Sequence, residues 1–283
     1  MRIDLHTHTS VSDGTDSPTR LVGKAAAQGL DVIALTDHDT FDGIREAQLA
    51  ASEAGITVLS GIEMSCKLDG ASIHLLGYGC NPHDGPLLDE LAKVRVGRTG
   101  RLPAMLAKLT ALGLPLTEDE VLHHVGASPS MGRPHVADAM VAKGYVRDRQ
   151  EAFDRYLYDG GPAYAHRYAT DIRDGIQLIR QAKGVAVIAH PWGRGRRAEL
   201  TDGFLTELAL EYRLDGVEID HPDHDDDTRA QLRVLTAQLG LLGTGSSDHH
   251  GLGKTNNDLA CNTTSGEVYA EIVRRIHARG GQL

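Results

Sequence analysis

The chain has 283 residues, with 29 Lys and Arg against 39 Asp and Glu, a formal net charge of −10, 15 His and 3 Cys. Hydrophobic residues make up 41% and charged residues 24%, values typical of globular proteins, so a disordered, collagen-like or coiled-coil chain is excluded. The acidic balance also argues against a protein that holds long nucleic acid through a broad basic surface. The excess of histidine is the feature that needs an explanation.

The cysteines, Cys66, Cys80 and Cys261, are far apart and form no CxxC pair, which fits neither a disulfide framework nor a thiolate zinc site. We expect them to be reduced packing residues. No apolar run approaches the ~20 residues that span a bilayer, and the chain becomes polar too early for a signal peptide. These features predict a cytoplasmic location, with no membrane association and no obligate protein partner.

Short apolar runs alternate with amphipathic stretches, the pattern of parallel strands covered by helices. The predicted strands are, in chain order, residues 3–5, 32–36, 57–61, 73–78, 185–189, 216–219 and 241–245. Helices are predicted from Ser17-Pro18 to Gly29 and over residues 40–54, 170–182 and 227–239, each followed closely by a glycine. This alternation predicts an α/β fold, a TIM-like barrel.

The alternation stops between residues 82 and 166, a stretch with helix signals but no convincing strand. Leucines recur at helical spacing, Thr117 and Glu120 form a capping box, and Asp148 with Glu151 marks a similar helix start. We therefore expect residues 1–81 and 167–283 to form the barrel. Residues 82–166 are predicted to form an all-helical insertion that acts as a substrate lid.

Histidines and carboxylates lie on or just after the predicted strands. His6 and His8 follow the first strand, and residues two apart in an extended segment lie about 6.6 Å apart on one face, so both imidazoles can reach one ion. The other strands carry His38, Glu63, His74, His190, Asp248 and His250. Because the carboxyl ends of parallel barrel strands form the active face, the sequence predicts a metal site there. For His74, an ordinary strand histidine remains an alternative.

The ordered motifs are Asp4-Leu5-His6-Thr7-His8-Thr9 with Asp13, Thr36-Asp37-His38-Asp39, Gly61-Ile62-Glu63, Ala189-His190-Pro191 and Ser247-Asp248-His249-His250-Gly251. In combination they resemble the polymerase and histidinol phosphatase (PHP) superfamily. Gly132-Arg133-Pro134-His135 adds a resemblance to stand-alone phosphoesterases of that superfamily, which include 3′,5′-nucleoside bisphosphate phosphatases and short-RNA 5′-exonucleases. The resemblance implies a distorted seven-stranded barrel with three divalent metals.

The resemblance also implies which residues hold each ion. The first ion would be held by His6, His8, Glu63 and Asp248. The second would be held by a bridging Glu63 with His74 and His190, and the third by Asp13, His38 and His250. Imidazole and carboxylate ligands without thiolate suit Mn, Fe or Zn. The family favours manganese, with two or three ions bound.

Such a centre predicts a metal-dependent phosphoric monoester hydrolase, in which a metal-bound hydroxide attacks phosphorus. The resemblance implies that the leading substrate is a nucleoside 3′,5′-bisphosphate, which would lose its 3′-phosphate. Arg133, at the start of a predicted helix, and His135 on the same turn are predicted to bind the substrate. Arg194 belongs to a run of basic residues that either grips a second phosphate or is a solvated charged segment.

The leaving-group donor and the substrate remain open at the level of sequence. The candidates that could protonate the leaving alcohol are Asp37, His221 and His224. The alternative substrates are histidinol phosphate and short RNA trimmed from its 5′ end. A metal-binding regulatory module and an amidohydrolase-like hydrolase of an amide or lactone are alternatives of other classes.

Overall fold

A curved sheet forms the centre of the molecule. The computed structural model describes residues 1–283, except for the side chain of Arg194. Its strands are β1 (Ile3–Thr7), β2 (Val32–Leu35), β3 (Thr57–Leu68), β4 (Ala71–Tyr78), β6 (Val185–Ile188), β7 (Gly216–Asp220) and β8 (Leu242–Gly245), adjacent in that order, with β5 (Thr170–Asp171) paired to β3. Thr7 also bridges to His249, just after β8. The sheet is thus a nearly closed barrel, which confirms the predicted TIM-like fold.

The strand β4 departs from the expected parallel arrangement. It runs antiparallel to both β3 and β6, whereas the β1–β2, β2–β3, β6–β7 and β7–β8 pairs are parallel. The reason is the connection: only Asp69 and Gly70 join β3 to β4, and both have positive φ, as in a tight hairpin. A parallel crossover needs a dozen residues or more. The prediction that every barrel strand is parallel was therefore wrong for β4.

The inner face of the barrel is apolar near the amino ends of the parallel strands and polar near their carboxyl ends. One buried cluster joins side chains from β1, β2, β3, β4, β6 and β8. In β3 this cluster includes Leu59, and residues at even spacing share a face, so Glu63 points to the same side. In the antiparallel β4 the cluster includes Leu76, and His74 follows on that face. Because of this alternation, the side chains of Glu63 and His74 both lie on the inner face of the barrel, above the apolar cluster, which forms the floor of the site.

A β-bulge in β1 sets the direction of His6. Ile3 pairs with Val32 and Thr7 with Leu35, so one extra residue of β1 lies between the same two points of β2. In a regular strand Ile3 and His6 would point to opposite faces. The bulge allows Ile3 to pack in the apolar floor while His6 still faces the site.

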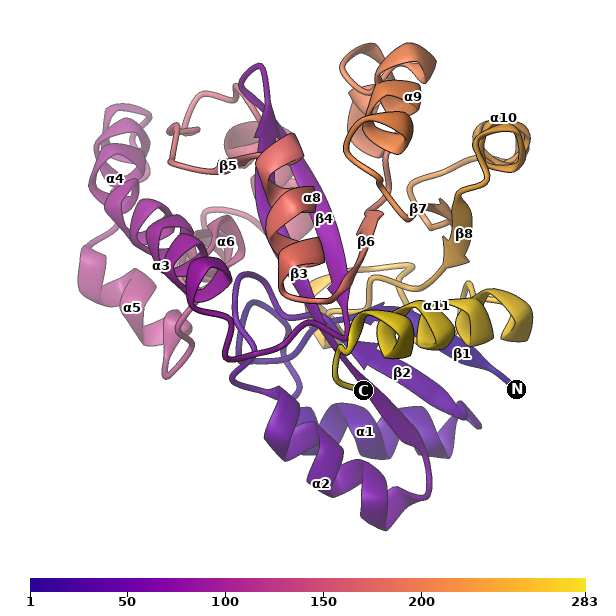
Figure 1. The fold of residues 1–283 in the computed structure, drawn as a ribbon. Helices are drawn as coiled ribbons and strands as arrows, with labels where there is room; N and C mark the ends of the chain where they lie inside the picture. The colour runs from indigo at the N-terminus through magenta and orange to yellow at the C-terminus, as the bar shows by residue number, and fades with distance from the viewer.

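Helices cover the outside of the barrel (Figure 1). They are α1 (Pro18–Ala27), α2 (Ile44–Ala54), α8 (Ile172–Gln181), α9 (Asp202–Leu210), α10 (Asp226–Leu239) and α11 (Gly266–Arg279), with short 3₁₀ turns η2 (Gly193–Ala198) and η3 (Gly251–Gly253). Ser17 caps α1 as predicted. However, α2 begins four residues later than expected, because the hydroxyl of Thr40 accepts a hydrogen bond from the Asp42 N–H and forms a turn there.

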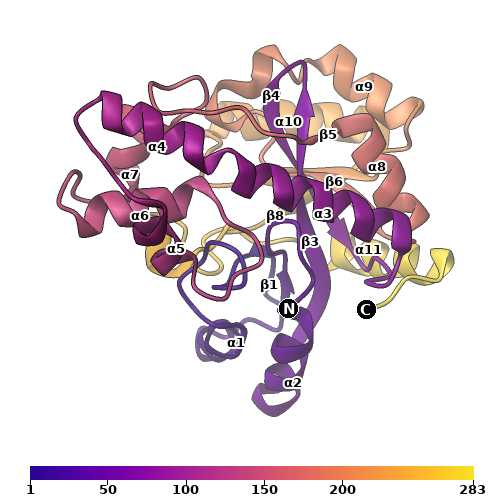
Figure 2. The same ribbon diagram turned by 90° about the vertical axis from the view of Figure 1, so that its left-hand side faces the viewer.

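The stretch from 82 to 166 contains only helical elements and lies to one side of the barrel, facing the viewer in Figure 2. The elements are α3 (Gly85–Gly100), α4 (Leu102–Ala111), α5 (Glu118–Val125), α6 (Arg133–Ala142), α7 (Arg149–Ala152) and the π-helical turn η1 (Phe153–Leu157). From α4 to η1 they share a core of their own. By contrast, Leu87 and Leu91 of α3 pack in a barrel cluster, so α3 connects the two parts. A lid function for this stretch remains a prediction.

None of the helices that the structure describes combines the length and apolar character needed to cross a bilayer.

Candidate metal centre

The four residues predicted to hold a first ion converge at the carboxyl end of the barrel. The Nε2 atoms of His6 and His8 are 3.1 Å apart. Glu63 Oε2 lies 3.4 Å from His6 Nε2 and 3.1 Å from His8 Nε2, and Asp248 Oδ1 lies 3.4 Å from both nitrogens. Four tetrahedral ligands at about 2.1 Å from an ion are about 3.4 Å from each other. The donor set therefore fits one small divalent ion.

Glu63 extends this arrangement to a second set of donors. Its other oxygen, Oε1, lies 2.7 Å from His74 Nδ1 and 3.5 Å from His190 Nε2. One carboxylate oxygen thus faces each set, the arrangement of a bridging ligand. His74 reaches this position because β4 is antiparallel, which brings its amino-terminal part beside the carboxyl ends of the other strands. This placement favours the ligand role over that of an ordinary strand histidine.

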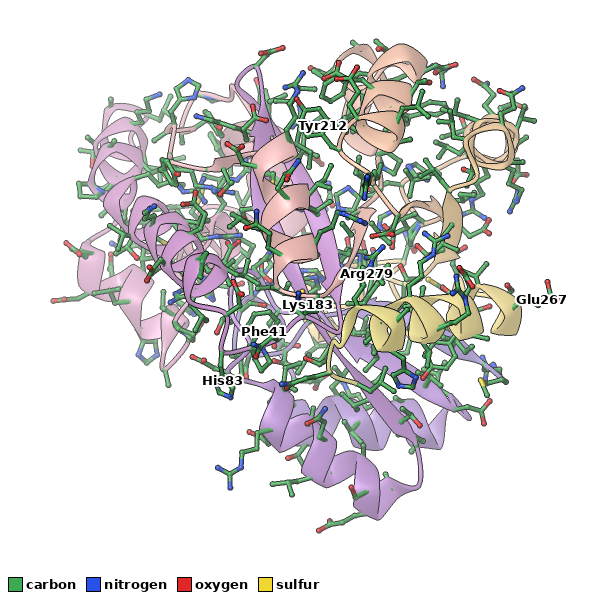
Figure 3. All side chains as sticks on the ribbon, in the orientation of Figure 1. Phe41, His83, Lys183, Tyr212, Glu267 and Arg279 are labelled. Carbon is green, nitrogen blue, oxygen red and sulfur yellow. The ribbon has the colours of Figure 1, made fainter. Side chains whose placement is uncertain are left out.

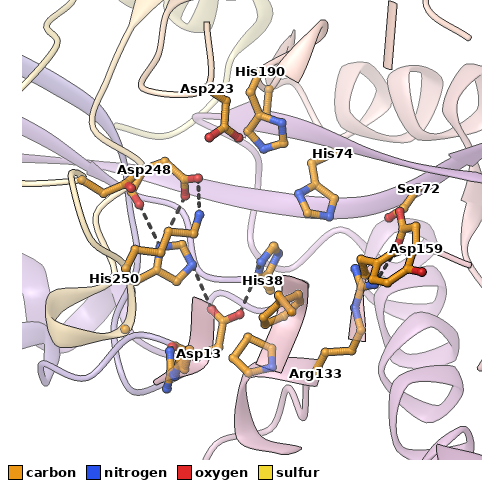
Figure 4. A pocket seen from close by; sticks show the side chains of 18 of the residues that line it. Asp13, His38, Ser72, His74, Arg133, Asp159, His190, Asp223, Asp248 and His250 are labelled. Atoms are coloured by element: carbon orange, nitrogen blue, oxygen red, sulfur yellow. Dashed lines mark hydrogen bonds and ion pairs between the residues drawn. The ribbon is translucent and has the colours of Figure 1, made fainter. Parts of the chain in front are cut away.

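Asp13 lies between His38 and His250, as Figure 4 shows. Its Oδ1 is 3.3 Å from His250 Nε2 and its Oδ2 is 3.7 Å from His38 Nε2. His38 also directs Nδ1 to Glu63 Oε2 at 3.0 Å, so this third set adjoins the first. By contrast, His83 lies away from this site and is exposed on the surface (Figure 3).

The electrostatics of the site favour bound cations. Burial alone would raise the pKa of Glu63, but His38, His74 and His6 outweigh it and hold that pKa well below its usual range. The same holds for Asp13, where the neighbouring His38 and His250 lower the pKa. Burial lowers the pKa of His250 to about 4, so this imidazole is neutral. At His8, burial lowers the pKa, but hydrogen bonds to Asp248 and Glu63 outweigh it and raise that pKa to about 9, so a metal would displace a proton from this imidazole.

Backbone strain also collects at this end of the barrel. Asp39, His190 and Asp248, which follow β2, β6 and β8, have φ of 57°, 31° and 52°. Non-glycine residues rarely adopt this left-handed region, and it costs of order 1 kcal/mol or more each time. The surrounding hydrogen bonds hold these conformations: the His190 N–H donates to Glu218 Oε2 at 2.8 Å.

Glu218 is a buried site residue that the sequence reasoning missed. Its Oε1 lies 3.2 Å from His6 Nδ1 and accepts a hydrogen bond from the Ser246 hydroxyl. A carboxylate on the second nitrogen of a metal-binding histidine fixes the ring and makes it a better ligand. The available signal was a glutamate inside the apolar strand Val217-Glu218-Ile219, where burial requires a partner.

We predict that Glu218→Gln lowers the affinity of the protein for divalent metal by about 10- to 100-fold, the usual effect of removing such a supporting carboxylate. Isothermal titration of metal into the chelator-treated protein measures this. The matched control is Glu211→Gln, an exposed glutamate at the end of α9. An affinity within twofold of the wild-type value would contradict the role given to Glu218.

The three candidates for proton donor lie behind the pocket wall rather than on it. The carboxylate of Asp37 accepts hydrogen bonds from the Thr9 N–H and from the hydroxyls of Thr9 and Ser12, which fixes the loop that carries Asp13. His221 Nδ1 accepts from the Asp223 N–H, so its proton is on Nε2, 3.3 Å from Asp248 Oδ2. His224 donates from Nδ1 to the Ile219 carbonyl. These contacts favour positioning roles over proton donation.

The three predicted substrate-binding residues differ in their placement. Arg133 begins α6 and lines the pocket, where it donates to Asp159 Oδ1 at 2.5 Å (Figure 4). His135 does not line it: this residue is buried, and its Nδ1 accepts from the Gly132 N–H to cap α6. This arrangement corrects the expectation that His135 faces the substrate. The side chain of Arg194 lies outside the described part of the chain.

A cavity of about 760 Å³ opens above the three donor sets. Its wall combines the predicted ligands with residues of the helical stretch, including Arg98, Arg101 and Arg133. The cationic side chains on the wall are Arg98, Arg101, Arg133, Arg149, Arg167, Arg196 and Lys254, and they outnumber the carboxylates outside the donor sets, Asp148, Asp154, Asp159 and Asp223. Cavities of 300 to 1,000 Å³ are of the size that encloses a small organic ligand. The site therefore suits a small anion beside divalent cations.

Comparisons with known proteins agree with this geometry. The PHP domain model matches residues 4–115. A 3′,5′-nucleoside bisphosphate phosphatase of Chromobacterium violaceum is 31% identical over 280 residues, which cover 98% of this chain and 97% of that protein. The chain belongs to the PHP family. A 5′-3′ exoribonuclease of Haemophilus influenzae is 34% identical to this PHP protein over 252 residues, which cover 88% of the chain and 90% of the relative.

A solved structure extends the match to the whole fold. A protein from Bifidobacterium adolescentis, described as a metal-dependent phosphoesterase, superimposes on this PHP protein with a TM-score of 0.90 at 35% identity, covering 96% of each chain. The relatives and this structural neighbour share both the barrel and the helical stretch with it. The chain is thus a metal-dependent phosphoesterase, and the predicted family, fold and enzyme class are confirmed.

Proposed function

We propose that this PHP phosphoesterase hydrolyses phosphate monoesters of small nucleotides, most readily the 3′-phosphate of nucleoside 3′,5′-bisphosphates. The observation that carries the proposal is the cationic wall of a cavity whose floor is the candidate metal centre. The chain has a net charge of −10, so these cations are a local feature of the pocket. They suit a compact substrate with more than one phosphate.

The residues that would hold the ions are those of the three donor sets, and we propose three ions with manganese as the first choice. Divalent ions in such a set would supply a water-derived nucleophile at neutral pH and neutralise phosphate charge. The chain itself holds the donors in place: Lys254 and His221 both contact Asp248 Oδ2, which leaves Oδ1 for the centre. Arg133 is placed to orient the substrate from the cavity wall.

A second candidate activity is the trimming of short RNA from a 5′-phosphate end. The similarity to the Haemophilus influenzae exoribonuclease favours it, because this relative matches 88% of the chain at 34% identity. Both activities place a phosphate ester at the same centre. The two activities differ in what the cavity wall must hold: one nucleoside for the phosphatase, or the nucleotides that follow the 5′ end of an RNA for the exonuclease.

The test compares substrates on the purified protein supplied with Mn²⁺. We expect release of phosphate from adenosine 3′,5′-bisphosphate far faster than from histidinol phosphate. The same protein is then given 5′-phosphorylated RNA of two to ten nucleotides. Faster turnover of histidinol phosphate would refute the leading proposal. A higher kcat/KM for the short RNA than for adenosine 3′,5′-bisphosphate would favour the exonuclease activity.

A further inference from the structure

Four arginines from separate parts of the chain gather on one side of the cavity wall, and we name them the arginine cluster. Arg98 lies on α3, Arg101 between α3 and α4, Arg133 at the start of α6, and Arg167 just before β5. Burial lowers the pKa of Arg101, and the positive charges of Arg167, Arg133 and Arg98 lower it further. Like charges this close repel, so something must compensate them.

Two members of the cluster are already compensated by carboxylates. Arg98 donates from Nε to Asp39 Oδ2 at 2.6 Å, and Arg133 pairs with Asp159. Asp159 is shared, since Arg196 also pairs with it. Among the described residues, Arg167 donates to one backbone carbonyl, that of Tyr168, at 3.1 Å. Burial and the nearby Arg98 lower the pKa of Arg167 to about 10.

Arg101 differs from these residues, because no described carboxylate compensates its charge. Only 6% of its surface is exposed, and its buried Nε has no hydrogen-bond partner. Within the part of the chain that the structure describes, no carboxylate forms an ion pair with it. Arg101 lies between the carboxyl end of α3 and the amino end of α4, and its side chain makes no cap hydrogen bond there, so the two helix ends give its charge no net partner. Burying an unpaired charge is costly, so an anion bound beside Arg101 would stabilise this part of the protein.

The cluster also adjoins the candidate metal centre. A Cβ on Gly132 would lie 3.4 Å from Arg98 Nη1 and 3.8 Å from Asp13 Oδ2, so the arginine and the third donor set meet at this glycine. Arg98 further donates to the Ser65 hydroxyl at 2.6 Å, on the strand that carries Glu63. One ligand with two anionic groups can therefore occupy both places within the cavity.

We infer that Arg101 is the centre of a second anion subsite, which binds a phosphate group of the substrate other than the one that is hydrolysed. Arg101 lines the cavity, and an arginine guanidinium is a planar fork that matches phosphate oxygens. The inference rests on the proposed function in that it gives the substrate a second phosphate. It assigns this recognition to Arg101, because Arg133 is already paired with Asp159.

The activity test measures kcat/KM for adenosine 3′,5′-bisphosphate and for adenosine 3′-monophosphate, and follows their ratio. Arg101→Gln is expected to lower this ratio roughly 10- to 100-fold, the factor that charge-assisted hydrogen bonds supply. Arg101→Lys keeps the charge without the fork and should fall in between. The matched control is Arg155→Gln, an exposed arginine of η1 outside the cavity, which should keep the wild-type ratio. A ratio within twofold of wild type in Arg101→Gln would overturn the inference.

A binding test separates this inference from the proposed function. Thermal unfolding of chelator-treated protein is followed with and without sodium sulfate, using sodium chloride at matched ionic strength as the reference. We expect sulfate to raise the Tm of the wild type more than that of Arg101→Gln, and the variant without sulfate to be at least as stable as the wild type. Equal sulfate shifts in both would overturn the subsite. A shift that depends on Arg101, in a protein that fails to hydrolyse the bisphosphate, would support the subsite and refute the function.

Discussion

Glu63→Gln is expected to reduce phosphatase activity by roughly a thousandfold or more. Glu63 directs one oxygen to the nitrogens of His6 and His8 and the other to His74. An amide has one oxygen and carries no charge, so it cannot serve both donor sets. The variant should also lose bound metal, because the substitution removes the negative charge that the first and second donor sets share.

Three measurements check this prediction: phosphate release, metal content by mass spectrometry, and thermal unfolding. The control is Glu53→Gln, which removes the same charge from an exposed position of α2. It should keep both the activity and the metal content. If Glu63→Gln retained two or more ions per chain and near wild-type turnover, the bridging role would have to be abandoned.

Asp13→Ala and His250→Ala are each expected to lower kcat by roughly a hundredfold or more while the protein stays folded. Asp13 Oδ1 is 3.3 Å from His250 Nε2, and His38 lies on the other side of this carboxylate. Removing either residue leaves the third set with too few donors. The fold should survive, because Asp37 holds the loop of Asp13 through other residues.

Metal content distinguishes this from a general loss of the centre. We expect each variant to bind one ion fewer than the wild type and to keep the others. His277→Ala, on the exposed side of α11, is the matched histidine control and should keep the full content. Unchanged activity in both Asp13→Ala and His250→Ala would refute a role for the third donor set in the reaction.

The placement of the donor sets could be predicted because their positions are local properties of the chain. His6 and His8 follow a short apolar strand, and His190 and Asp248 each follow another, so a parallel barrel brings them to one end whatever its details. The helix starts were also readable, since Ser17 before Pro18 and the Thr117 and Glu120 capping box act within a few residues.

Other features depended on contacts between distant parts of the chain. The antiparallel direction of β4 is what brings His74 to the site, and it follows from a two-residue turn that the strand pattern alone does not distinguish from a longer connection. Asp37 stands within a recognisable motif, yet its three hydrogen-bond donors belong to a different loop. Local sequence cannot show which carboxylates face the cavity.

By itself the sequence determined the family, the barrel, and the residue types available to hold divalent ions, because strand periodicity and motif order require no knowledge of long-range packing. Only the tertiary structure decided which charged groups are satisfied. Glu218 contacts His6 although the two residues are more than 200 positions apart in the sequence. Folding also buries Arg101 and leaves its Nε without a hydrogen-bond partner. Burial and pairing are properties of the folded molecule, and they distinguish an exposed surface arginine from a buried one without a carboxylate partner.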